Sequence, residues 1–107
     1  MVAKSQIYDI IYIQPISVLA GCQYGAGADY RGLISPTRRG YTCQRWDTQS
    51  PHQHTRNNSA WFPDRTLEEA GNFCRNPYGG GAGVWCYTSD PHTRWDYCNV
   101  TQCSDGE

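Results

Sequence analysis

A glycine-rich segment between two cysteines is the first place in this chain where chemistry could occur. Residues 74–88 read CRNPYGGGAGVWCYT, with Tyr78 ahead of the glycines and Trp85 and Tyr87 around the second cysteine. Glycine runs can cradle phosphates, but the segment has no Gly-x-Gly-x-x-Gly spacing and no following Lys-Ser or Lys-Thr. The sequence therefore predicts no nucleotide site and no cofactor, and it favours a binding role for the aromatic side chains.

The cysteines could act as metal ligands, as nucleophiles or as disulfide partners. The chain of 107 residues contains six of them, with no Cys-x-x-Cys pair and no histidines at zinc-ligand spacing. An even set in a small chain is typical of a disulfide framework, and such a framework leaves no thiolate for catalysis. We therefore predict disulfides and no metal site, in a secreted, extracellular protein, because disulfides persist in oxidising compartments. The residues alone leave fifteen pairings open among Cys22, Cys43, Cys74, Cys86, Cys98 and Cys103.

Patterns for other catalytic and nucleic-acid-binding sites are absent from the sequence. There is no Gly-x-Ser-x-Gly elbow, and the adjacent acids Glu68 and Glu69 should diverge on a helical turn. The net charge of −1 argues against nucleic acid as a partner. We therefore predict that the chain is not an enzyme and that it binds a protein partner as a single, monomeric domain.

Few regular elements are available to position a binding site. Residues 66–71, TLEEAG, predict one helical turn in which Thr66 is the N-cap and Glu69 its capping-box partner. Residues 84–88 and 94–98 predict two short strands joined by the turn SDPHT. The predicted fold class is a small, disulfide-rich, loop-dominated domain with short antiparallel β-strands.

Two sequons for N-glycosylation fit the extracellular prediction. One begins at Asn57, within a long loop over residues 50–64 that shows no periodicity, and the other begins at Asn99. Both asparagines are therefore candidate glycosylation sites.

The two ends of the chain lie outside the cysteine-rich region. Residues 1–21 contain several isoleucines, but Asp9, Gln14 and Pro15 interrupt any signal-peptide core. We predict that this segment is an N-terminal flank, either an extended segment or an added extension, and that residues 104–107 are a C-terminal tail. No apolar run reaches the roughly 18 residues of a membrane span.

The residues around the cysteines resemble the kringle family from Cys22 to Cys103. The matching stretches, in order, are Tyr30-Arg31-Gly32, Cys43-Gln44-Arg45-Trp46, Ser50-Pro51-His52, Phe73-Cys74-Arg75-Asn76-Pro77, Trp85-Cys86-Tyr87-Thr88 and Arg94-Trp95-Asp96-Tyr97-Cys98. The resemblance implies the disulfides Cys22–Cys103, Cys43–Cys86 and Cys74–Cys98. It also implies core positions for Trp46 and Leu67, turn positions for Gly32 and Gly40, and structural roles for Tyr30, Asn76 and His52.

Many kringles bind a lysine side chain in a pocket that has an anionic end, an aromatic trough and a cationic end. The resemblance assigns the trough to Trp85, Tyr87 and Trp95, and the cationic positions to Arg94 and Arg56. The two acidic positions hold Tyr78 and Gly80 in this chain, so both carboxylates are missing. An ammonium ligand would lose charge-assisted hydrogen bonds worth roughly 1.5–3 kcal/mol each.

The resemblance therefore implies a non-catalytic extracellular protein-interaction module with a degenerate lysine-binding pocket. Such a pocket would hold a lysine or carboxylate-bearing ligand only weakly. An alternative is a functional lysine-binding kringle in which Glu68, Glu69 or Asp90 supplies the anionic end. A third hypothesis is an engineered kringle binder with diversified loops, which the tyrosine- and glycine-rich YGGGAG segment suggests.

Overall fold

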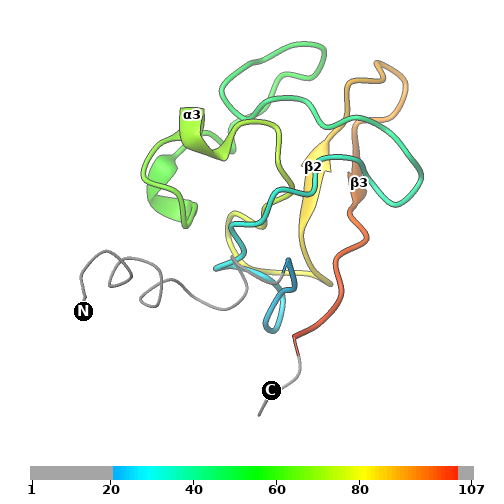
Figure 1. Ribbon diagram of the computed structural model, residues 1–107. Helices are drawn as coiled ribbons and strands as arrows, with labels where there is room; N and C mark the ends of the chain where they lie inside the picture. The colour runs from blue at the N-terminus through cyan, green and yellow to red at the C-terminus, as the bar shows by residue number, and fades with distance from the viewer. Residues whose placement is uncertain (1–20, 104–107) are drawn as a thin grey trace, which may run out of the picture.

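The computed structural model describes residues 21–103, so the predicted flank before Gly21 and the predicted tail at 104–107 lie outside the described residues. Its regular elements are the 3-10 turn η1 (Ser59–Trp61), the helix α3 (Leu67–Ala70) and the strands β2 (Trp85–Tyr87) and β3 (Trp95–Tyr97). Figure 1 shows the two strands side by side among long loops, with α3 to one side. None of the helices in residues 21–103 is long and apolar enough to cross a membrane. The predicted loop-dominated fold class is confirmed.

Three disulfides connect these loops. They join Cys22 to Cys103, Cys43 to Cys86 and Cys74 to Cys98, which confirms the pairing that the family resemblance implied. The two inner disulfides meet at the centre of the domain, where the Sγ atoms of Cys43 and Cys74 are 3.8 Å apart. The pairs are separated by 81, 43 and 24 residues in sequence, and closing loops of this length stabilises a fold by about 3–5 kcal/mol each in the chain-entropy model.

The two strands form an antiparallel hairpin, as predicted. The paired residues are Trp85 with Tyr97, Cys86 with Asp96, and Tyr87 with Trp95. Because side chains alternate across a strand, the four aromatic residues lie on one face, and Cys86 and Asp96 lie on the other. Both strands are shorter by one residue at each end than the sequence predicted, and isolated bridges from Arg75 and Cys43 widen the sheet.

The indole of Trp46 is the centre of the core. Its ring packs edge-to-face against Phe62, Trp85 and Tyr87, at centroid distances of 5.1, 5.2 and 5.8 Å. Its Nε1 donates a hydrogen bond to the carbonyl of Phe73, 2.7 Å away, and Leu67 packs against the same cluster. The core positions implied for Trp46 and Leu67 are therefore confirmed.

The helical turn α3 is capped largely as predicted. The Thr66 hydroxyl accepts a hydrogen bond of 3.1 Å from the Glu69 amide, which is the expected N-cap. The predicted return bond from Glu69 to Thr66 is wrong. The Glu69 carboxylate instead accepts from the backbone and guanidinium N–H groups of Arg65, at 3.3 and 2.9 Å, because Arg65 offers a charged donor one residue earlier.

The two glycines assigned to turns have different roles. Gly40 has a φ of 91° and donates to the Thr37 carbonyl within a turn, as expected. The turn role of Gly32 is wrong, because this residue lies outside the left-handed region and a Cβ there would collide with the phenol ring of Tyr30. Glycine at this position allows the buried Tyr30 ring to pack against the backbone.

A buried ion pair joins the loop after η1 to the segment that precedes the glycine run. The Arg75 guanidinium donates to both carboxylate oxygens of Asp64, at 2.8 and 3.1 Å, and both side chains are almost completely buried. The remaining Arg75 nitrogen donates to the carbonyls of Gly32 and Cys74. The backbone of Arg75 also pairs with that of Trp85 in both directions, so this ion pair positions residues that lead directly into residues 76–81.

We expect Asp64→Asn to lower the free energy of unfolding by about 3 kcal/mol or more, because it leaves the Arg75 charge buried without a counter-charge. The matched control is Glu69→Gln, which removes the exposed Arg65–Glu69 pair and should change stability little. Guanidinium unfolding of both variants with the disulfides intact checks this prediction, and similar losses in the two variants would contradict it.

Candidate ligand-binding site

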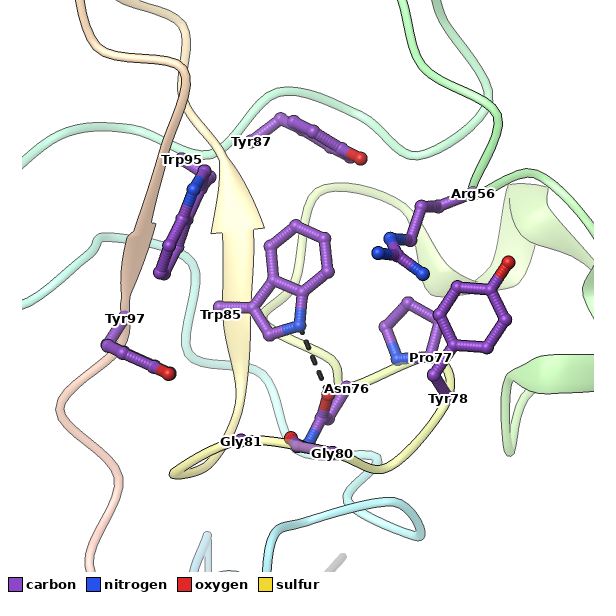
Figure 2. Close-up of a pocket in the computed structure, with 10 residues that line it drawn as sticks. All are labelled: Arg56, Asn76, Pro77, Tyr78, Gly80, Gly81, Trp85, Tyr87, Trp95 and Tyr97. Carbon is purple, nitrogen blue, oxygen red and sulfur yellow. Dashed lines mark hydrogen bonds between the residues drawn. The ribbon is translucent and has the colours of Figure 1, made fainter.

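The aromatic face of the hairpin forms one wall of a cavity of about 300 Å³. Trp85 and Tyr87 from β2 and Trp95 and Tyr97 from β3 line it, and Figure 2 shows their rings along the two strands. Trp85 and Trp95 meet edge-to-face at 6.0 Å between centroids, and Trp46 supports Trp85 from the core. These rings form an apolar trough, in which Trp95 remains 46% exposed.

The opposite wall is formed by residues 76–81. The buried Asn76 side chain ties this wall to the trough, because its Oδ1 accepts from Trp85 Nε1 at 3.1 Å, drawn as the dashed line in Figure 2. Its Nδ2 donates to the carbonyls of Ala26 and Gly80. All polar atoms of the Asn76 amide group are therefore used within the protein, which agrees with the structural role implied by the resemblance.

Tyr78 has an unusual backbone conformation within this wall. Its φ is 81°, in the left-handed region that bulky residues rarely adopt. Its ring contacts two side chains from the long loop: the Trp61 ring, at a centroid distance of 4.1 Å, and the guanidinium of Arg56, whose carbon is 4.0 Å from the Tyr78 centroid. Figure 2 shows Arg56 entering from the right, with its guanidinium above Pro77 and Tyr78. The loop over residues 50–64 therefore covers the position where the lysine-binding pattern has its first acid.

The structure brings together five of the six predicted pocket residues: Arg56, Tyr78, Trp85, Tyr87 and Trp95 line the cavity. The sixth, Arg94, is not part of the lining; its guanidinium carbon lies 5.2 Å from the Tyr87 ring centroid. The asparagines of both predicted sequons, Asn57 and Asn99, are exposed, and their glycosylation stays a prediction.

No acidic residue among residues 21–103 lines the cavity. Gly80, at the second acidic position, contributes only backbone. Glu69 is bound to Arg65, and the Asp90 carboxylate accepts from the His92 amide within its own turn. Asp96 points to the other face of β3, where it pairs with Arg39 at 3.1 Å. The cavity therefore combines an apolar trough with one arginine.

A buried histidine supports the trough from behind. The ring of His54 stacks on Tyr87 at 4.5 Å and 18°, and its Nε2 hydrogen-bonds to the Thr48 carbonyl at 3.0 Å. Nε2 must carry the proton to donate this bond, which leaves Nδ1 buried without a partner in residues 21–103. Burial lowers the pKa of His54 below its ordinary 6.5, and the charge of Arg94 lowers this pKa further, against the opposing effect of the Thr48 carbonyl.

A family model described as Kringle domain matches residues 22–103. The chain belongs to the kringle family. It is also 46% identical over 86 residues to apolipoprotein(a)-like protein 2 of Homo sapiens, a stretch that covers 80% of this chain and 62% of that relative. The chain therefore spans less than two thirds of the length of this curated relative, and the comparison shows the domain rather than a whole protein.

Several residues that line the cavity or pack against its lining were not predicted from the sequence. Tyr97 was detectable, because it follows Trp95 at the two-residue spacing that puts side chains on one face of a strand. The contact of Trp61 with Tyr78 and the position of His54 under Tyr87 had no comparable signal. These contacts join segments that are far apart in the sequence, and only the folded loops bring them together.

We expect His54 to make the folded kringle less stable in mild acid. Because the pKa of His54 is lower in the folded state than in the unfolded one, its contribution is complete above about pH 6.5 and is lost as the pH falls through the folded-state value. The free energy of unfolding should therefore decrease as the pH falls below about 6.5. His54→Gln should flatten this dependence, whereas the exposed His92→Gln should preserve it. Equal slopes in wild type and His54→Gln would contradict this role.

Proposed function

We propose that this kringle is a non-catalytic extracellular protein-interaction module whose pocket does not accept a lysine side chain. The observation that carries the proposal is the contact of Arg56 with Tyr78 at the expected anionic end of the trough. The aromatic residues that would hold an aliphatic chain are all in position. The two carboxylates that would hold its ammonium are missing, because Tyr78 and Gly80 stand at their positions, and the Arg56 cation lies against Tyr78 instead.

The position of Arg56 disfavours an ammonium ligand in two ways. Without a carboxylate in the lining, the ligand gains no charge-assisted hydrogen bond, an interaction worth roughly 1.5–3 kcal/mol. The Tyr78 ring could have offered a cation–π contact, but the Arg56 guanidinium already occupies one face of that ring at 4.0 Å, with Trp61 at 4.1 Å between centroids. A second cation nearby would also be repelled.

The contacts of the acidic side chains do not support the alternative of a rearranged lysine site. Glu69 is held by Arg65, Asp90 by its own turn, and Glu68 lies exposed on α3. The extracellular part of the proposal is supported by the three disulfides, which persist in oxidising compartments. The two exposed sequon asparagines also fit such a location.

Restoring the acids provides the test. Gly80 has a φ outside the left-handed region and open space around a Cβ, and aspartate tolerates the positive φ of position 78 better than tyrosine does. We therefore expect Tyr78→Asp/Gly80→Asp to bind 6-aminohexanoate at least about tenfold more tightly than wild type, since each charge-assisted hydrogen bond adds that much or more.

The matched control is Tyr78→Asn/Gly80→Asn, which opens the wall to the same extent without adding charge. Tryptophan fluorescence reports binding, because Trp85 and Trp95 line the cavity. Micromolar binding of 6-aminohexanoate to the wild-type protein would refute the proposal. Equal gains in the aspartate and asparagine variants would show that the missing charge is not the reason for weak binding.

A further inference from the structure

We propose that the pocket selects a carboxylate carried on an apolar stem, so that its charge preference is opposite to that of a lysine site. This inference rests on the proposed function, because it assigns a ligand class to the same cavity. It follows from three features of the described residues: the free donors of Arg56, the arginines over the tyrosine rings of the trough, and the shape of the trough.

Arg56 has donors available for an anion. Its guanidinium contacts Tyr78 through the ring face, and stacking of this kind leaves the N–H groups at the edge of the guanidinium free to donate. Among residues 21–103 no acceptor is hydrogen-bonded or ion-paired to Arg56, in contrast to Arg39, Arg45, Arg65 and Arg75, which all contact carboxylates. A half-buried guanidinium in an aromatic cavity therefore lacks an anion, and a ligand carboxylate would supply one in bidentate geometry.

Two further arginines lie beside the trough and raise its positive potential. The guanidinium of Arg94 lies over Tyr87 and that of Arg38 over Tyr97, with the guanidinium carbon 5.2 and 5.3 Å from the ring centroids. Neither forms an ion pair within residues 21–103. Each of the three tyrosines that line the cavity therefore has an arginine over its ring, and a hollow bordered by one sign of charge attracts the opposite sign.

The size and lining of the trough determine the rest of the ligand. A volume of about 300 Å³ is at the small end for ligand pockets, which suits one side chain or a short acid. The exposed Trp95 ring and the Trp85 ring offer flat apolar contacts for methylene or aryl groups. The ligand that fits is a monocarboxylate with an aliphatic or aryl stem, either a free acid or the C-terminal residue of a protein.

Ligands with one stem and different charges test the proposal directly. We expect hexanoate to quench or shift the fluorescence of the pocket tryptophans saturably, and hexylamine at equal concentration to bind at least about tenfold more weakly. Arg56→Gln should weaken hexanoate binding roughly 10- to 100-fold. The control Arg65→Gln removes an equal charge from an arginine outside the cavity lining and should leave the affinity unchanged.

Salt provides a second measurement that needs no variant. Hexanoate affinity should fall between about 50 and about 500 mM NaCl if the carboxylate is recognised by charge.

Equal binding of hexanoate and hexylamine, an unchanged affinity in Arg56→Gln, or salt-independent binding would each overturn the proposal. If no probe binds, this inference fails and the proposed function stands, whereas tighter binding of hexylamine or 6-aminohexanoate than of hexanoate refutes both.

A pair of peptides distinguishes the two possible sources of the carboxylate, a protein C-terminus and a small free acid. An N-acetylated tripeptide ending in leucine with a free C-terminus is compared with its C-terminal amide. Binding of the free acid at least as tight as that of hexanoate, with loss of binding in the amide, supports a protein C-terminus as the ligand. Binding of hexanoate alone supports a small free acid instead.

Discussion

The contact between the two inner disulfides is the constraint on which the rest of this kringle depends. With the Sγ atoms of Cys43 and Cys74 3.8 Å apart, the crossed bridges hold together four segments that have little regular structure of their own. Cys86 lies in the middle of β2 and Cys98 directly follows β3, so the bridges fix the back of the hairpin. Its aromatic residues are then free to face the cavity, since alternate side chains of a strand point to opposite faces.

The charge at the cavity depends on a second, weaker set of interactions. Tyr78 holds a positive φ that costs on the order of 1–3 kcal/mol, and the described contacts that oppose this cost are those of its ring with Trp61 and Arg56. Each of these contacts is worth roughly 0.5–1.5 kcal/mol. The cost and the contacts are therefore of similar size, and the buried Arg75–Asp64 pair fixes the residue that directly precedes this wall.

The sequence was sufficient to predict the parts of the structure that follow local or family patterns. The disulfide pairs, the two strands, the Thr66 cap and the trough residues Trp85, Tyr87 and Trp95 all belong to this group. The contact of Arg56 with Tyr78 could not be predicted, because a bulky residue with positive φ and a contact between residues 22 positions apart leave no local signal. The errors at Gly32 and Glu69 have a similar origin, since in each case a neighbouring side chain, Tyr30 or Arg65, decided the role.

In the ligand site that we propose, these two sets of interactions divide recognition between different parts of the chain. The hairpin and the disulfides determine the apolar trough, which treats the stem of an amine and of an acid alike. The loops over residues 50–64 and 76–81 determine the charge at its end, and selectivity is the difference between the two binding free energies. Because the trough contributes equally to both, the loss of carboxylates at positions 78 and 80 together with the contact of Arg56 with Tyr78 can change the preferred ligand charge while the core around Trp46 stays as it is.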